Sequence, residues 1–231
     1  MKSQFPLFYP PFYEMSTLTG RSWDSKMRTY HFYPLRRKSR RCPMLRVAAE
    51  EDVSAMLAIY RPYVLSSTAT FEYDPPGEEE FLRRYHTVTA QFPWLLWEED
   101  GQILGYAYAS LPFSRAAYAW CAEPTIYLKS QARGKGIGKA LYDALEAILD
   151  AQGYYLLYSL VCGENENSLR FHEKRGYRTV AHFPACGFKF GRWLDLDWME
   201  KRLHSADPPG GSPVPWQAVM QNAEITHQYF R

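Results

Sequence analysis

The sequence predicts an α+β fold, and two features carry this prediction. Residues 94–98 and 103–110 are apolar runs joined by Asp100-Gly101, a strong signal for a β-hairpin and therefore for antiparallel strands. Further along, an amphipathic helix over 136–152 separates two strand-like segments, as in a β-α-β unit. Antiparallel hairpins followed by a β-α-β unit are typical of α+β proteins.

Helices are predicted where apolar residues recur every three to four positions. Residues 51–65, for example, place Val53, Met56 and Tyr60 on one helical face. Gly153 and Gly176 are suited to end helices, because glycine readily adopts the left-handed conformation of a C-terminal cap. Strands are predicted where aromatic and β-branched residues gather. In chain order, the sequence predicts strand 45–48, helices 51–65 and 78–88, strands 94–98, 103–110 and 118–128, helix 136–152, strand 155–161, helix 167–175, and strands 179–183 and 193–199.

The formal net charge of +2 conceals two ends that differ from the middle of the chain. Residues 1–43 hold nine Lys/Arg against two Asp/Glu, a net charge of +7, and they lack helical or strand periodicity. We interpret them as a basic extension upstream of a true start at Met44. Residues 204–231 open with a Pro/Gly-rich stretch, which we interpret as the start of a tail that docks through Trp216. One folded domain is therefore expected over 44–203.

Composition also narrows the compartment and the partners. Cys42, Cys121, Cys162 and Cys186 lie far apart and form no C-x-x-C pair, so no metal site and no redox centre is expected. No run approaches the roughly 18 apolar residues of a membrane-spanning helix, and no secretory signal is evident. We therefore expect a cytoplasmic protein with no membrane partner. The net charge of −5 after residue 43 disfavours a nucleic-acid partner.

A glycine-rich turn follows the strand predicted over 118–128. Glycines let the backbone approach a ligand, and the unpaired amides of the next helical turn favour a phosphate. The chain lacks the G-x-x-x-x-G-K-[ST] pattern of P-loops, and its glycines lack the Rossmann spacing. Two interpretations stay open, an anion site of another kind and a plain connection from strand to helix. The turn reads Gln131-Ala132-Arg133-Gly134-Lys135-Gly136-Ile137-Gly138-Lys139-Ala140.

Two segments resemble motifs of the GCN5-related N-acetyltransferases, the GNAT superfamily. The glycine-rich turn resembles the Q/R-x-x-G-x-G/A motif, and residues 165–177 resemble N-x-x-[AS]-x-x-x-Y-x-x-x-G-[FY], with His172 in place of the tyrosine. This histidine and several other segments are similar to the phosphinothricin and L-amino-acid N-acetyltransferase branch. These segments are Thr68-Ala69-Thr70-Phe71, Phe92-Pro93-Trp94-Leu95, Gly105-Tyr106-Ala107-Tyr108-Ala109, Arg115-Ala116-Ala117-Tyr118 and Glu123-Pro124-Thr125-Ile126-Tyr127-Leu128.

The resemblance implies the GNAT fold, a central mixed, mostly antiparallel twisted sheet flanked by helices, with splayed central strands that hold acetyl-CoA. It implies acetyl-CoA as cosubstrate and no metal, with the pyrophosphate on the glycine-rich turn and the pantetheine arm on a bulged strand. Asn165 also suits a helix cap, and the two roles can coexist. The residues so assigned to acetyl-CoA are Ile126, Tyr127, Leu128, Arg133, Gly134, Lys135, Gly136, Ile137, Gly138, Lys139, Asn165 and Ser168.

The resemblance also implies two catalytic residues, Glu123 and His172. Glu123 would accept the proton of the attacking amine, directly or through a water, although an ordinary solvated carboxylate is the competing interpretation. His172 has an unperturbed pKa near 6.5, which suits proton transfer at neutral pH, either to the departing thiolate or from the amine. Its competing interpretation is a histidine packed on a helix flank.

The acceptor pocket is assigned to Phe71, Arg115 and Tyr118. Arg115 matches a family R-x-x-Y element and would bind the carboxylate of an amino-acid-like substrate, because a guanidinium fits a carboxylate well. A surface salt bridge is an equally good interpretation of Arg115, and large aromatic residues such as Phe71 are often core. Residues 184–193 resemble a loop that forms a pocket wall or dimer contact in the branch, so a homodimer is expected on resemblance.

Several functions remain open from the sequence. The first is an acetyl-CoA-dependent N-acetyltransferase for a small amine, an amino acid or an analogue such as phosphinothricin or methionine sulfone. The second is an N-acetyltransferase for a protein N-terminus, a polyamine or an antibiotic. A non-catalytic acyl-CoA-binding module is a third, and the presence of both Glu123 and His172 argues against it. A nucleic-acid-associated protein that uses residues 1–43 is a fourth.

Overall fold

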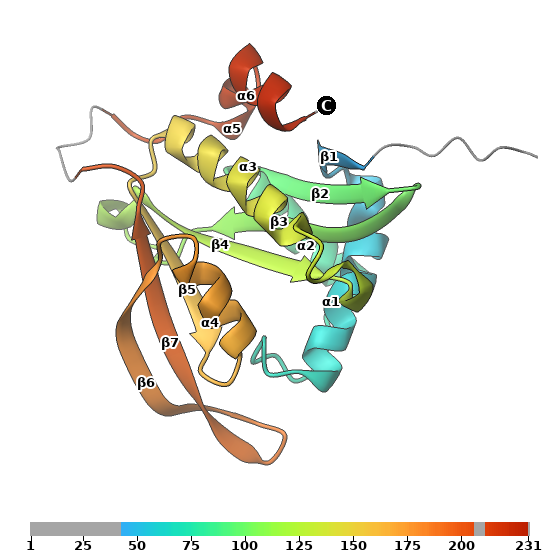
Figure 1. Cartoon of the computed structure of the whole chain (residues 1–231), viewed down its shortest axis with the longest axis vertical. Helices are drawn as coiled ribbons and strands as arrows, with labels where there is room; N and C mark the ends of the chain where they lie inside the picture. Colours follow the sequence, from blue (N-terminus) through green and yellow to red (C-terminus); the bar gives the residue numbers. More distant parts are fainter. Residues whose placement is uncertain (1–42, 206–210, 231) are drawn as a thin grey trace, which may run out of the picture. The chain divides into compact units, whose positions relative to one another are not determined.

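The computed structural model describes residues 43–205 and 211–230. Seven strands form one sheet in the order β1-β2-β3-β4-β5-β7-β6, in which β4 and β5 are parallel and all other neighbours are antiparallel (Figure 1). This confirms the predicted α+β fold with a mixed, mostly antiparallel sheet. The strands are β1 Met44–Val47, β2 Trp94–Glu99, β3 Gln102–Ser110, β4 Cys121–Leu128, β5 Leu156–Cys162, β6 Arg178–Lys189 and β7 Arg192–Arg202.

Helices cover both faces of the first half of the sheet, because its strands are apolar on both sides. Trp94 and Leu96 of β2 pack in the cluster with α1 and α2, whereas the intervening Leu95 packs in the cluster with α3. Figure 1 shows α4 beside β5, and α5 and α6 beside α3. The helices are α1 Val53–Ser66, α2 Glu78–Thr89, α3 Ile137–Gln152, α4 Glu166–Glu173, α5 Trp216–Val219 and α6 Ala223–Tyr229, with short 3₁₀ turns η1 Glu50–Asp52, η2 Ala116–Tyr118 and η3 Ser130–Ala132.

The central strands separate after a short contact. β4 and β5 pair along their length only at Cys121↔Leu156 and Ala122↔Leu157, although β4 continues to Leu128. The expected splay is therefore present. The bulge implied by the resemblance is not found between β3 and β4, since their register runs unbroken up to Gly105↔Leu128. β4 therefore stays paired with β3 up to Leu128, while β5 diverges from it after Ala122.

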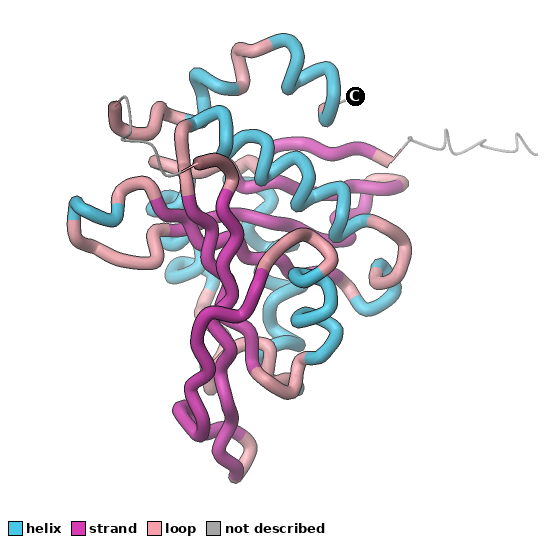
Figure 2. Tube along the Cα trace, turned by 60° about the vertical axis from the view of Figure 1, so that its left-hand side comes forward, coloured by secondary structure: helices cyan, strands magenta, loops and turns pink. Residues whose placement is uncertain are grey.

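The hairpin of β6 and β7 is longer than predicted (Figure 2). The sequence suggested strands 179–183 and 193–199 with a loop between them, whereas the strands run to Lys189 and from Arg192. Proline and glycine are disfavoured within strands, but a register shift between Phe183 and Gly187 accommodates Pro184 and Gly187 without ending β6. The hairpin closes through a turn at residues 190–191, where both residues have positive φ.

The remaining differences lie at the edges of elements and in the tail. Residues 118–120 precede β4 and do not belong to it, because the chain first forms the η2 turn. Trp216 docks the tail as predicted, its indole N–H donating to the carbonyl of Thr89 at 2.9 Å. The predicted extension, residues 1–43, lies outside the described residues except for Pro43. Within the described ranges, no helix is both long and apolar enough to cross a membrane.

Candidate active site

The edge of β4 that borders the gap offers one main amide. Lys129 donates its N–H to Leu104 of β3 at 2.8 Å, so the N–H of Leu128, one residue earlier, faces the gap. The N–H of Ile126 faces the same edge by the two-residue repeat of a strand, and Pro124 has no N–H. Because the Leu128 N–H already donates to the Tyr63 hydroxyl, Ile126 is the β4 residue best placed to donate a hydrogen bond into the gap.

The Tyr63 hydroxyl of α1 is hydrogen-bonded to both backbone polar groups of Leu128. The Tyr63 hydroxyl accepts from the Leu128 N–H at 3.1 Å and donates to the Leu128 carbonyl at 2.5 Å. The Arg133 guanidinium lies over the Tyr63 ring, 5.2 Å from its centroid, and the Tyr127 ring lies 4.9 Å away. Sequence reasoning missed Tyr63 because helical spacing identifies the face of a residue but not the hydroxyl partner across the fold.

The glycine-rich turn forms an anion cradle at the start of α3. Gly134 and Gly136 have φ of +72° and +81°, and an added Cβ at either would meet no atom of the described residues within 4 Å. The helix begins without a side-chain cap, so its first amides have no partner within the helix and can receive a phosphate. An added Cβ at Gly138 would lie 3.4 Å from side-chain atoms of both Ile126 and Leu128, which sets this first turn against the gap.

The basic residues of the turn differ in their surroundings. Lys135 is exposed, while the Lys139 ammonium donates to the Asp143 carboxylate at 2.6 Å, four residues along α3. The cradle as described therefore depends on backbone amides more than on this lysine. Because the amides, the open space at both glycines and the splayed strands coincide, the residues present fit a nucleotide-linked thioester such as acetyl-CoA.

Glu123 lies on β4 directly opposite Ser110 of β3. Its side chain is half-buried, and among the described residues no hydrogen bond or ion pair reaches its carboxylate. Burial raises the pKa of Glu123 above its ordinary value, because the charged form loses hydration. A carboxylate in this state accepts protons more readily than a solvated one.

His172 is buried in α4, with 4% of its surface exposed, and both ring nitrogens have partners. Nδ1 lies 2.8 Å from the Ser168 carbonyl, which can only accept, so Nδ1 carries the proton. Nε2 lies 3.1 Å from the hydroxyl of Tyr142, which also lies 3.1 Å from the Pro124 carbonyl of β4. Burial lowers the pKa of His172, which leaves a neutral ring with its lone pair toward Tyr142.

The segment that opens α4 serves this histidine. The Asn165 side chain accepts from the Ser168 N–H at 3.3 Å, so the predicted capping role of Asn165 is confirmed. Ser168 in turn holds the His172 ring through its carbonyl. The cofactor contacts expected of Asn165 and Ser168 stay predictions.

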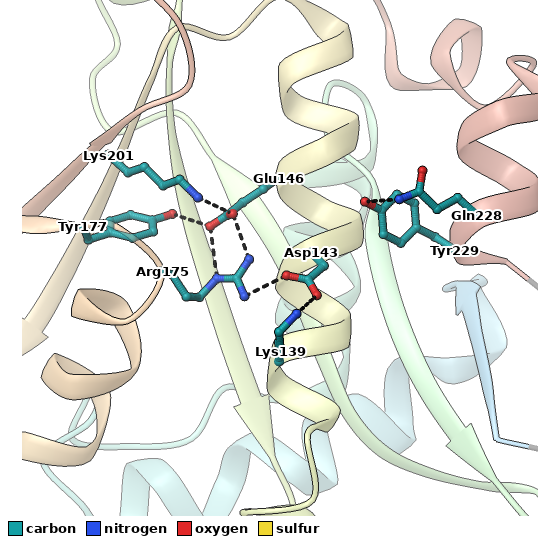
Figure 3. A network of polar contacts seen from close by, with 8 residues as sticks. All are labelled: Lys139, Asp143, Glu146, Arg175, Tyr177, Lys201, Gln228 and Tyr229. Atoms are coloured by element: carbon teal, nitrogen blue, oxygen red, sulfur yellow. Dashed lines mark hydrogen bonds and ion pairs between the residues drawn. The ribbon is translucent and has the colours of Figure 1, made fainter.

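A buried carboxylate on α3 organises the far side of Tyr142. Glu146 accepts hydrogen bonds from Arg175 at 2.8 Å, from Lys201 at 2.7 Å and from the Tyr177 hydroxyl at 3.2 Å (Figure 3). The Arg175 guanidinium also lies over the Tyr142 ring, 5.2 Å from its centroid. Helical periodicity marked α3 as amphipathic, but the partners of Glu146 come from β7 and from the turn before β6, which no local pattern links to α3.

The predicted acceptor residues do not form a single contact group. Phe71 follows α1 and packs against Gly187 of β6, where an added Cβ would come within 2.2 Å of the ring. Arg115 and Tyr118 are exposed at η2, and the Tyr118 ring contacts Phe113 at a centroid distance of 4.5 Å. Within the described residues, no hydrogen bond or ring contact joins Phe71 to Arg115 or Tyr118. The described part of the chain also contains no cluster of His, Cys, Asp and Glu that could hold a metal.

Comparisons with known proteins agree with this geometry. Residues 45–198 match the acetyltransferase (GNAT) domain family. The chain is 31% identical over 170 residues to a phosphinothricin N-acetyltransferase of Streptomyces viridochromogenes, covering 74% of this chain and 93% of that protein. It is 32% identical over 173 residues to an L-methionine sulfoximine/L-methionine sulfone acetyltransferase of Pseudomonas aeruginosa, covering 73% and 98%.

A solved structure supports the same relationship. The crystal structure of a GNAT phosphinothricin acetyltransferase from Sinorhizobium meliloti in complex with acetyl-CoA superposes with a TM-score of 0.72 and 37% identity, covering 75% of this chain and 96% of that one. The family and branch predicted from the motifs are confirmed. The chain belongs to the GNAT acetyltransferase family, and it is an N-acetyltransferase.

Proposed function

We propose that this enzyme transfers the acetyl group of acetyl-CoA to the amino group of a small amino-acid-like acceptor, of the phosphinothricin, methionine sulfone or methionine sulfoximine type. The carrying observation is the gap between β4 and β5, with the partly buried, unpaired Glu123 on one strand and the anion cradle at its edge. The match covers 93% of the phosphinothricin N-acetyltransferase and 98% of the methionine sulfoximine/methionine sulfone acetyltransferase. The substrates in these two names support the proposed acceptor class.

Bound acetyl-CoA would supply an activated acyl group with a thiolate that leaves. The backbone amides from Gly134 to Lys139, with Arg133 and Lys135 beside them, would hold the pyrophosphate. The Ile126 N–H would donate to the carbonyl oxygen as negative charge develops on it. Leu128 and Tyr127 would instead shape the wall of the gap, because Tyr63 already occupies the backbone of Leu128.

Glu123 would remove a proton from the acceptor ammonium. Only the free amine has the lone pair that forms the new bond to the acyl carbon as the carbon–sulfur bond breaks. The nitrogen then carries one surplus proton, and its transfer to the departing thiolate would give the amide and CoA thiol. A raised pKa suits this task, since a base closer to neutrality competes better for the proton of an amine.

His172 would assist from inside the protein. Its neutral ring and its contact with Tyr142 make it a proton acceptor through the Tyr142 hydroxyl, which favours help with amine deprotonation over donation to the thiolate. On this account Tyr142 is the group nearest the gap, and His172 positions its hydroxyl.

The acceptor would bind between the segment after α1, residues 67–73, and η2, the turn that precedes β4. Phe71 would pack against the acceptor chain, and Arg115 with Tyr118 would bind its carboxylate from η2. Both η2 residues are exposed and thus accessible to a small solute.

We also propose that the protein is a homodimer formed through the β6–β7 hairpin. Phe188, Phe190 and Trp193 lie near its turn and are exposed by 46%, 54% and 65%. Aromatic side chains gathered on one projecting hairpin are typical of a protein interface. Sedimentation at two concentrations would show a dimer for the unmodified chain and a monomer for Trp193→Asp.

The working domain is proposed to span residues 44–203, with Met44 as the natural start and a cytoplasmic location. Within the described residues, the first strand begins at Met44, and the free Cys121, Cys162 and Cys186 suit a reducing compartment. Sequencing the N-terminus of the natively expressed protein should find Met44. Finding Met1 on the mature chain would contradict this start.

A release assay tests the proposed acceptor class. Acetyl-CoA is mixed with the enzyme and one amine at a time, and free CoA thiol is measured. Phosphinothricin, methionine sulfone and methionine sulfoximine should release thiol well above spermidine, an N-terminal peptide and an aminoglycoside. Release with one of these larger amines alone would replace the proposed acceptor, and thermal stabilisation by CoA without any release would indicate a binding module.

A further inference from the structure

Lys189, at the end of β6, is a lysine with 1% of its surface exposed. Its ammonium donates to the carbonyl of Ser67 at 2.8 Å and to that of Thr70 at 2.7 Å, and it lies 5.0 Å from the ring centroid of Phe190. No ion pair joins it to a carboxylate in the described ranges. A buried cation without a counter-charge is costly unless its donors are satisfied. These two carbonyls are therefore fixed in place as the lysine's partners.

The two residues before Lys189, Gly187 and Phe188, also contact the segment that contains Ser67 and Thr70. An added Cβ at Gly187 would lie 2.2 Å from the Phe71 ring, so the ring packs directly on the β6 backbone. The hydroxyl of Tyr73 donates to the Phe188 carbonyl. Three consecutive residues of one strand thus contact residues 67–73.

Residues 67–73 depend on such contacts for their conformation. They follow α1 and form no helix or strand, so no regular ladder of backbone hydrogen bonds fixes them. From α1, the Tyr60 hydroxyl lies 2.9 Å from the Thr70 hydroxyl. Lys189 binds the backbone carbonyl of Thr70 itself and that of Ser67, three residues earlier, and Phe71 follows Thr70 directly.

We propose that Lys189 is a positioning and specificity-determining residue for the acceptor amine. It ties the β6–β7 hairpin to the segment that carries Phe71, and so fixes the wall of the acceptor pocket without touching the acceptor or acetyl-CoA. The proposal rests on the proposed function, in which Phe71 contacts the acceptor. It assigns to the hairpin a part in acceptor selection in addition to any part in dimer formation.

The test compares two identical substitutions in neighbouring strands. Lys189→Met keeps the length of the side chain but removes the bonds to Ser67 and Thr70. Lys201→Met is the matched control, because the Lys201 ammonium contacts Glu146 on α3 and not residues 67–73. Lys189→Met should raise the KM for phosphinothricin and for methionine sulfone by about tenfold, the effect of losing roughly 1.4 kcal/mol of acceptor binding. The Kd for acetyl-CoA should stay within about twofold, and Lys201→Met should change neither constant.

A merely structural role would give a different result. It would lower the melting temperature and the active fraction, and hence kcat, while the acceptor KM stayed unchanged, and that pattern would overturn the proposal. If Lys189→Met does not fold, Tyr73→Phe is the variant to measure. It removes only an exposed hydroxyl that is bonded to the Phe188 carbonyl of β6. An acceptor KM for Tyr73→Phe equal to that of the unmodified enzyme would then overturn it.

The outcome also separates this proposal from the proposed function. An unmodified enzyme that acetylates neither acceptor overturns both. An enzyme that acetylates them with the same KM before and after Lys189→Met keeps its proposed function and loses only the role of Lys189.

Discussion

Nε2 of His172 lies 3.1 Å from the hydroxyl oxygen of Tyr142, and the opposite ring nitrogen is held by the Ser168 carbonyl. The imidazole of His172 is therefore connected to β4 through the Tyr142 hydroxyl. Tyr142 has one hydroxyl proton and two acceptors, His172 and the Pro124 carbonyl. When His172 is neutral the proton can point to its Nε2, and when His172 is protonated the hydroxyl must accept from Nε2 and donate to Pro124. The charge on His172 and the orientation of the Tyr142 hydroxyl are thus coupled.

Removal of the Tyr142 hydroxyl should slow catalysis without weakening the binding of acetyl-CoA. We expect Tyr142→Phe to lower kcat by about 10²-fold, at the low end for a positioned acid or base, with the Kd for acetyl-CoA unchanged. Tyr154→Phe is the matched control, because Tyr154 is equally buried but its hydroxyl is bonded to Gln91. Steady-state kinetics and calorimetry check both variants. Equal kcat for the two would remove Tyr142 and, with it, His172 from the mechanism.

Substitution of Glu123 should separate activity from stability. Glu123→Gln should lower kcat by about 10²- to 10⁴-fold, because the amide cannot accept the amine proton. It should also raise the melting temperature at pH 7.5, since the folded enzyme no longer holds an ionised carboxylate that burial disfavours. A raised folded pKa weakens stability above the unfolded pKa, so this gain should vanish below about pH 4, where the carboxyl is protonated in both states. Thermal scans at the two pH values check the sign, and a melting temperature lower than that of the unmodified enzyme at pH 7.5 contradicts it.

The dependence of kcat on pH should reflect the raised pKa of Glu123. The base works only when ionised, so kcat at saturating acceptor should fall as pH drops through the Glu123 pKa, which lies above the ordinary value of about 4.3. His172 has a lowered pKa and loses its acceptor lone pair only below about 6.5. The residual activity of Glu123→Gln should lack the glutamate limb. A profile identical in shape for both enzymes would assign the limb to another group.

The anion cradle can be tested with two glycines of equal strain. Gly136 and Gly176 have φ of +81° and +86°, and in the described part of the chain an added Cβ at either would have no neighbouring atom within 4 Å. Alanine at either site should cost about 1–2 kcal/mol of stability through the left-handed backbone. Only Gly136→Ala should weaken the binding of acetyl-CoA, by about tenfold or more in Kd, because the added Cβ enters the space for the phosphates. Similar Kd values for the two variants would place the cofactor elsewhere.

Local signals predict the parts of this fold that local physics determines. The Asp100-Gly101 hairpin, the buried stripe of α3 and the glycine-rich turn depend on residues close together in sequence, and all three are found. The length of β6 was underestimated because Pro184 and Gly187 are accommodated by a register shift that depends on β7. Pairing across the sheet is not encoded in either residue alone.

The site shows the same division. Glu123 and the glycine-rich turn follow from motifs along one stretch of chain. Tyr63, Tyr142 and Lys189 were missed, because each acts on a partner that is distant in sequence, such as Leu128 65 residues after Tyr63. A buried lysine or tyrosine has no distinguishing pattern in sequence until the carbonyl or imidazole it contacts is known.

Mass spectrometry of the reaction product tests the central claim most directly. The enzyme is incubated with acetyl-CoA and phosphinothricin, and N-acetylated phosphinothricin and free CoA are quantified together. The account predicts one acetylated amine for each thiol released, with both reduced together in Glu123→Gln. Release of thiol without acetylated amine, or no product while acetyl-CoA still raises the melting temperature, would contradict it.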